Sequence, residues 1–177
     1  MTTDHSALNA PVNPYAAPDS DLSNASEESG IEIFERFSAW GVFALMFVTG
    51  GIYYWFWLYN RTKSMNQVVE NKISGALVKS TITVIIGYLV CYLLLAFSAG
   101  AGSGALSAIF GALFAILYIP AIVLPYVWVF KIRNRLNQIT NSEKGDKTWA
   151  GPIMTFFFHG LYLQYKINQN LDEVKTN

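Results

Sequence analysis

The strongest constraint on this chain is an uninterrupted stretch of 51 residues, 80–130, that carries no charged side chain. Two shorter uncharged runs flank it, residues 38–60 and 148–165, and the second contains His159. A helix needs about 20 apolar residues to cross a bilayer. The long run therefore has room for two spans, and the buried core of a soluble domain would not supply all three runs.

The boundary between those two spans is marked by small residues. Segment 98–104 reads Ser-Ala-Gly-Ala-Gly-Ser-Gly, a composition typical of a turn. We expect helices over about 76–98 and 104–139, with further helices over about 31–66 and 151–173. The predicted fold class is all-α: a polytopic membrane helix bundle with about four transmembrane helices in a helical membrane domain, 31–174.

Composition supports a membrane location. Hydrophobic residues make up 53% of the chain and charged residues 14%, whereas a soluble domain has about 25% charged residues. This composition excludes an intrinsically disordered chain and argues against a soluble globular enzyme. Only one cysteine is present, so the chain is not stapled by internal disulfides.

Residues 1–30 differ from the rest of the chain. They contain no Lys or Arg and are rich in Ser, Ala, Asn, Asp and Pro. Such a segment cannot bury enough apolar surface to offset the entropy of ordering, so we expect a disordered tail. It also lacks the basic start and apolar core of a signal peptide.

Lys and Arg are distributed unevenly between the uncharged runs. Four lie in 60–80 and five in 131–148, whereas none lies between the second and third predicted helices. Because short cytoplasmic loops are rich in these residues, we expect loops 60–80 and 131–148 to be cytoplasmic in a multi-pass protein. Four full spans would place the N-terminal tail outside.

The fourth predicted helix leaves an alternative open. Its apolar part, 152–165, would be about 21 Å long, less than the roughly 30 Å hydrocarbon core. If the first and fourth helices do not fully cross, both termini lie inside. His159 lies within this segment, and we expect a neutral histidine that is hydrogen-bonded to a carbonyl.

Two sets of residues are candidates for contact with the membrane surface. The first predicted span ends in aromatic residues with polar groups, namely Tyr53, Trp55, Trp57 and Tyr59. Three cations follow the third predicted span, namely Lys131, Arg133 and Arg135. The aromatic set is typical of a belt at headgroup level. The cations fit ordinary anchoring to an anionic leaflet, with a selective anionic-lipid site as the alternative.

A third set predicts helix packing. Small residues recur every fourth position at the start of the third predicted span, namely Ser103, Ser107, Gly111 and Ala115. Small residues on one ridge let two helix backbones approach closely. This ridge is therefore expected to pack against another span.

The sequence contains no recognisable chemical site. Two histidines and one cysteine lie in unrelated regions, no glycine-rich phosphate loop precedes a lysine, and no pair of carboxylates lies in an apolar run. We therefore predict no catalytic, cofactor-binding or metal residues, and we expect no enzyme activity. A net charge of zero gives no reason to expect a nucleic-acid partner.

Three classes of function are compatible with this pattern. The first is a non-enzymatic accessory or structural membrane protein that contacts the lipid bilayer and binds a second copy of itself or another membrane protein. The second is a subunit of an oligomeric small channel or transporter, because one chain has too few polar residues for a lumen. The third, an intramembrane enzyme, lacks catalytic groups.

One segment also carries a family resemblance. Residues 49–59 read Thr-Gly-Gly-Ile-Tyr-Tyr-Trp-Phe-Trp-Leu-Tyr, and 160–168 read Gly-Leu-Tyr-Leu-Gln-Tyr-Lys-Ile-Asn. These segments resemble the bacterial domain-of-unknown-function 4234 family of small integral membrane proteins. The resemblance spans about 38–172 and implies a bacterial inner (plasma) membrane protein. It supplies no catalytic or binding residues.

Overall fold

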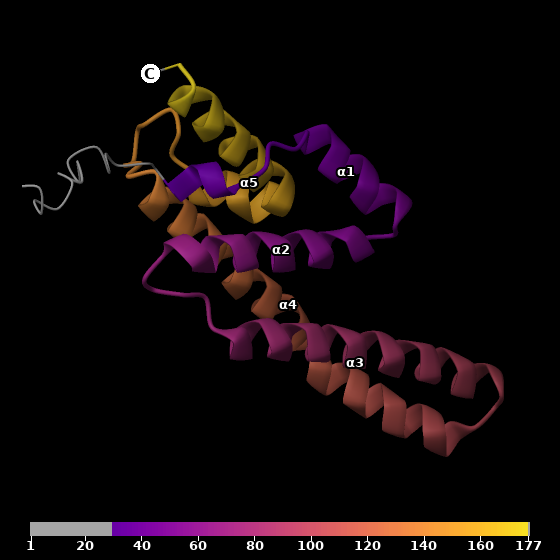
Figure 1. The fold of residues 1–177 in the computed structure, drawn as a ribbon. Coiled ribbons are helices and arrows are strands. Elements are labelled where there is room, and N and C mark those ends of the chain that lie inside the picture. The colour runs from indigo at the N-terminus through magenta and orange to yellow at the C-terminus, as the bar shows by residue number, and fades with distance from the viewer. Residues whose placement is uncertain (1–29, 177) are drawn as a thin grey trace, which may run out of the picture.

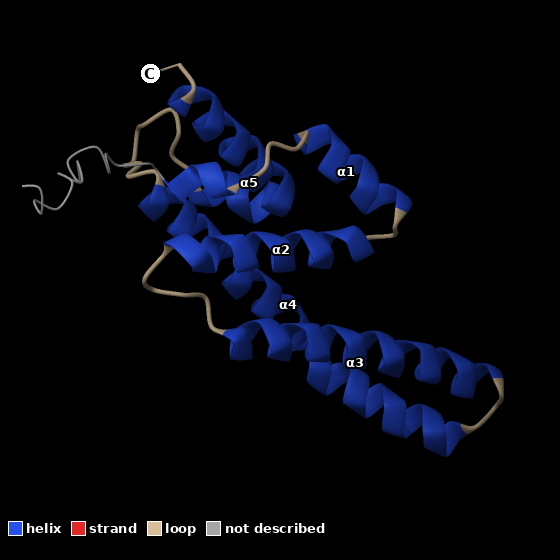
Figure 2. Ribbon diagram, viewed as in Figure 1, coloured by secondary structure: helices blue, strands red, loops and turns tan. Residues whose placement is uncertain are grey.

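The computed structural model of the chain describes residues 30–176, and the predicted tail lies outside the described residues except for Gly30. Within this range the secondary structure consists only of helices and connecting loops, which confirms the all-α prediction (Figure 2). The helices are η2 (Gly30–Ile33), α1 (Ala39–Val48), α2 (Ile52–Val68), α3 (Gly75–Gly100), α4 (Gly104–Ile139) and α5 (Pro152–Val174).

The helix expected over about 31–66 is instead three helices, so that prediction is wrong. The Ser38 side chain accepts a hydrogen bond from Gly41 N and caps a new helix, α1. The chain then reverses through Gly50 and Gly51, whose φ angles of 58° and 88° are readily adopted only by glycine. Helices α1 and α2 therefore form a short helical hairpin (Figure 1).

Helices α3 and α4 form a second, much longer hairpin that projects away from the other helices (Figure 1). Gly102 turns the chain between them at a φ of 73°. The two helices pack through stacked rings of Tyr88 and Phe114, whose centroids lie 4.5 Å apart. At Gly87 the α3 backbone lies close to Leu117, and a Cβ there would meet the Leu117 side chain at 3.5 Å, an ordinary van der Waals contact.

Helix α5 bends sharply at His159, which has φ 41° and ψ −122°. Before the bend α5 packs on α4, where Phe156 stacks on Tyr126 at 4.9 Å. After the bend the helix turns back toward its own first residues, as the hydrogen bond from Gly151 N to the Tyr162 hydroxyl at 2.9 Å shows. In a straight helix the eleven residue steps from Gly151 to Tyr162 would separate their backbones by about 16 Å.

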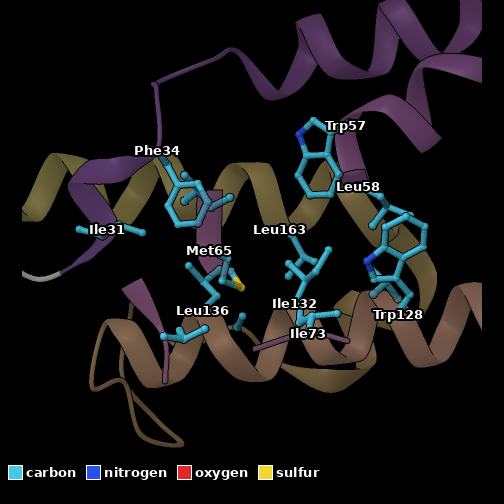
Figure 3. Packing of buried hydrophobic residues seen from close by; sticks show 14 of the residues in the cluster. Ile31, Phe34, Trp57, Leu58, Met65, Ile73, Trp128, Ile132, Leu136 and Leu163 are labelled. Atoms are coloured by element: carbon cyan, nitrogen blue, oxygen red, sulfur yellow. The ribbon is translucent and has the colours of Figure 1, made fainter. Parts of the chain in front are cut away.

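The core lies at the end of the molecule opposite the α3–α4 turn. We define the base as η2, α1, α2, α5 and the part of α4 from Pro125 to Ile139. Its buried side chains come from η2, α1, α2, α4, α5 and the segments between them, and they pack as one cluster (Figure 3), which includes Phe34, Trp57, Leu58, Met65, Trp128, Ile132, Leu136, Leu163 and Ile167.

Two of the described helices, α3 and α4, are long and apolar enough to cross a membrane. The most apolar stretches of the two helices are 6% and 0% buried, so neither is the core helix of a soluble fold. Four spans are not supported. Helix α1 has ten residues, or about 15 Å, and α5 bends in its middle.

Candidate functional site

The charged and uncharged parts of the described chain are separated in space by three bends. Each uncharged run folds back near its midpoint: 38–60 at the α1–α2 turn, 80–130 at the α3–α4 turn, and 148–165 at His159. Figure 1 shows the α1–α2 and α3–α4 turns at the same end of the molecule, opposite the C-terminus. Charged side chains therefore collect at the base, where the runs begin and end.

A buried amide holds the base together. Gln164 of α5 is completely buried, and its Oε1 accepts hydrogen bonds from Trp57 Nε1 and Arg61 Nη2, both at 2.9 Å. Its Nε2 donates to Phe37 O at 3.2 Å and to Asn168 Oδ1 at 3.0 Å. Gln164 thus ties α5 to α2 and to the linker 34–38 with every amide group in use.

Arg61 is the cation nearest to this amide. Its guanidinium also donates to Glu35 O at 3.4 Å and lies 5.6 Å from the centre of the Phe34 ring. Burial lowers the pKa of Arg61, while the nearby Tyr53 and Glu35 raise it. Arginine stays protonated in proteins, so a fixed positive charge lies between α2 and the linker.

Beside Arg61 lies a groove of about 480 Å³ between linker residues 33–37 and one face of α2. We call it the α2 groove. Its α2 wall changes from aromatic near the α1–α2 turn to polar and cationic near the base, through Tyr53, Phe56, Asn60, Arg61, Lys63 and Ser64.

The predicted surface cations have different roles. Arg133 Nε donates to Ala150 O at 2.7 Å, and its guanidinium lies 5.2 Å from the centre of the Trp149 ring. Arg135 Nε donates to Asn71 O at 2.6 Å. Both arginines therefore bind the connecting loops of the base, whereas Lys131 is exposed.

The predicted aromatic belt is also divided by the fold. Trp57 is 3% exposed and faces the core, so its assignment to a lipid-facing set is wrong. It lies on the same face of α2 as Leu58 and Met65, which pack against α4 and α5. Tyr59 is exposed, while Tyr53 and Trp55 are half-buried.

The sequence did not identify the aromatic group around the α5 bend. Tyr54 Oη lies 3.1 Å from His159 Nδ1, and the Tyr126 and His159 rings lie 4.7 Å apart. His159 has a tyrosine hydroxyl as a neighbour in addition to a backbone hydrogen bond at Phe156, the kind of contact that we expected. The one available signal was a histidine followed by glycine inside an uncharged run, and that pattern does not specify a bend.

The small-residue ridge lies partly against α3 of the same chain. Ser107 Oγ donates to Ser98 Oγ at 3.1 Å, and a Cβ on Gly111 would lie 3.8 Å from Leu95. Ser103 precedes the first turn of α4, and Ala115 is exposed. The strict four-residue spacing rotates slowly around a helix of 3.6 residues per turn, which takes Ala115 off the contact face.

Within residues 30–176, no three His, Cys, Asp or Glu side chains lie close enough together to hold a metal ion. The polar groups around Gln164 bond mainly to one another and to the backbone, as structural networks do. In the α2 groove, cations and aromatic rings line the same space.

Comparison with known proteins gives one match. The family model of a domain of unknown function (DUF4234) matches residues 37–138, more than half of the chain. The matched range covers α1, α2, α3 and nearly all of α4, and it ends before α5. No curated protein and no solved structure matches the chain.

Proposed function

The chain belongs to the family of the domain of unknown function DUF4234, and on that premise we propose that it is a non-enzymatic accessory protein of the bacterial inner membrane. The α3–α4 hairpin crosses the bilayer. The base lies at the cytoplasmic headgroups, and the α1–α2 turn and the α5 bend dip into the cytoplasmic leaflet. The exposed apolar faces of the hairpin contact lipid or the helices of a partner.

The observation that carries this proposal is the fold-back of each uncharged run at its middle. In α3, the uncharged segment 80–100 has 21 residues and would be about 31 Å long, which matches a hydrocarbon core of roughly 30 Å. Helix α4 returns over the uncharged segment 104–130, which has 27 residues, before Lys131. Charge therefore begins and ends where this hairpin would leave the bilayer.

The α1–α2 turn has a backbone suited to hydrocarbon. Unpaired backbone groups are very costly there. Each N–H from Thr49 to Tyr54 has an acceptor, and Gly51 N donates to Met46 O at 2.7 Å. The Thr49 hydroxyl accepts from Tyr53 N at 2.9 Å.

The side chains at this turn are also suited to lipid. Helix α1 would reach only about 15 Å, so the turn lies at mid-bilayer depth rather than crossing it. Three strongly exposed apolar side chains surround the turn, with 73–82% of their surface free: Phe47, Val48 and Ile52. The first half of α5 exposes Ile153 and Phe157 in the same way.

Charge supports the orientation. Loops 60–80 and 131–148 carry nine Lys and Arg residues, and the α3–α4 turn carries none. Basic loops favour the cytoplasmic side. With two spans and two re-entrant bends, both termini share that side, as in the alternative left open by the short apolar part of the fourth predicted helix.

Single-cysteine labelling tests the proposal directly. In a Cys91→Ser background, an impermeant thiol reagent is added to sealed right-side-out membrane vesicles. We expect Ser103→Cys to react at once, and Ser142→Cys and Thr176→Cys to react only after detergent is added. Labelling of Thr176→Cys in sealed vesicles would show that α5 crosses the membrane, and failure of Ser103→Cys to react would contradict the spanning hairpin.

A further inference from the structure

We propose that the α2 groove binds one anionic phospholipid of the cytoplasmic leaflet, with its phosphate between Arg61 and Lys63 and one acyl chain along Tyr53 and Phe56. This inference rests on the membrane position proposed above. It assigns a ligand to a site that plays no part in that proposal. It also places the lipid-binding residues away from Lys131, Arg133 and Arg135, the cations that follow the uncharged run 80–130.

The groove is amphipathic along its length. Tyr53, Phe56, Asn60, Lys63 and Ser64 lie three or four residues apart on α2, so they share one helix face. The aromatic end is nearest the α1–α2 turn, and the polar end is nearest the base. A phospholipid has the same order, with an apolar chain, polar linkages and then a charged phosphate.

The charges at the polar end favour an anion. The groove is lined by Arg36, Arg61, Lys63 and Glu35. Arg36 forms a bidentate ion pair with Asp172, so its charge is already balanced. The two positive charges of Arg61 and Lys63 then exceed the one negative charge of Glu35, so the polar end of the groove has a net charge of one positive unit.

Arg61 is held in place for this role. Both of its hydrogen bonds within the described residues come from Nη2, to Gln164 Oε1 and Glu35 O. Its Nε and Nη1 hydrogens therefore have no protein acceptor there, and arginine donors of this kind match phosphate oxygens in a paired geometry. The Ser64 hydroxyl lies on the same wall and adds a further donor.

The groove fits a lipid better than a free anion. Its volume of about 480 Å³ lies within the range of sites for organic ligands and exceeds what one phosphate requires. Its aromatic end would be left unused by inorganic phosphate. Lys63 and Arg61 are the first cations after the uncharged run 38–60, so they lie where the headgroup phosphates begin.

The test measures lipids that remain bound to the purified full-length chain. The protein is extracted in mild detergent, and native mass spectrometry gives the ratio of bound phosphatidylglycerol to phosphatidylethanolamine relative to the bulk membrane. We expect enrichment of phosphatidylglycerol on the wild type. Arg61→Gln with Lys63→Gln should lower that enrichment by about tenfold or more, because each cation near an anionic headgroup strengthens binding several-fold.

A matched control removes the same charge elsewhere. Lys79→Gln with Lys131→Gln deletes two exposed cations outside the groove and should keep the enrichment. Because Arg61 also contacts Gln164, the single variant Lys63→Gln is included. Lys63 has no hydrogen bond to the fold within the described residues, and its loss should lower enrichment by about fivefold without changing thermal stability.

The outcomes are separable from those of the proposed function. Lipids at bulk ratio on the wild type, or equal losses in the groove and control variants, would overturn the groove as a lipid site while the cysteine-labelling pattern stands. Enrichment lost only in the groove variants, with unchanged thermal midpoints for Lys63→Gln, would support it.

Discussion

The α3–α4 hairpin and the base use two different means of stabilisation within one chain. The hairpin consists of two exposed apolar helices that contact each other and little else, whereas the base buries tryptophans and a completely satisfied glutamine. Helix α4 belongs to both regions. Its residues before Pro125 are exposed or half-buried, and from Pro125 onward Trp128, Ile132 and Leu136 enter the core.

This difference shows that uncharged length does not specify burial. The same apolar composition faces outward in the hairpin and inward in the base. The two regions differ in which helices cover them, because α2 and α5 pack on α4 only in the part of α4 that belongs to the base. Substitutions of one residue type at matched positions in the two regions should therefore have very different effects on stability.

The largest effect is expected for Trp128→Ala. Trp128 is completely buried, and its Nε1 donates to the Thr62 hydroxyl at 2.8 Å. Loss of a buried aromatic side chain typically costs about 3–5 kcal/mol. The matched control, Trp40→Ala, removes a tryptophan that is 76% exposed. Chemical denaturation in detergent should show a large loss only for Trp128→Ala, and equal losses would contradict the idea that buried side chains stabilise the base.

The next effect in size is expected for Gln164→Leu. Leucine keeps the volume but leaves Trp57 Nε1, one Arg61 hydrogen and Phe37 O with fewer partners. A buried polar group without a partner costs about 1–3 kcal/mol, so we expect a loss of about 3 kcal/mol for the set. Gln138→Leu, at an exposed position of α4, is the control. If the Gln164→Leu variant were as stable as the wild type, the proposed structural role of this amide would be wrong.

Much of the hairpin could be predicted from the sequence, because its requirements are local. A span needs only uncharged length, and the Gly- and Ser-rich segment 98–104 contains the turn at Gly102. The α4 range expected from the sequence, about 104–139, coincides with the observed Gly104–Ile139. The pair Gly50-Gly51 is also a signal for a turn, and the turn that it forms breaks the helix expected over about 31–66.

The base could not be predicted in the same way, because its features depend on contacts between distant segments. Gln164 looks like an isolated polar residue until α2 and the linker 34–38 meet it. Arg133 and Arg135 follow a span as anchoring cations do, yet their guanidinium groups bind loop carbonyls 17 and 64 residues away. The bend at His159 has no local sequence signal comparable to a proline.

Glycine substitutions in the two regions should differ in their effect on stability, but by less than the substitutions above. A Cβ on Gly160 would lie 3.1 Å from the Trp57 ring and 3.3 Å from Met46, so Gly160→Ala should overpack the base and cost about 1–3 kcal/mol. Gly104→Ala, at the start of α4, meets nothing within 4 Å and should be neutral or stabilising by about 0.5 kcal/mol. Thermal midpoints in detergent measure both. A stable Gly160→Ala variant would mean that α5 and α2 do not pack as closely as the structure shows.

The smallest effect is expected inside the hairpin, at the hydrogen bond from Ser107 Oγ to Ser98 Oγ. Interhelical hydrogen bonds of membrane helices contribute only about 0.6 kcal/mol on average, because the separated helices also find partners. Ser98 can still bond to Leu95 O when Ser107 is replaced, which limits the loss further. A double-mutant cycle of Ser98→Ala and Ser107→Ala isolates the interaction, and Ser80→Ala, whose hydroxyl bonds only within α3, is the control. A coupling of several kcal/mol would show that the hairpin relies on polar contacts as the base does, and the contrast between the two regions would then be wrong.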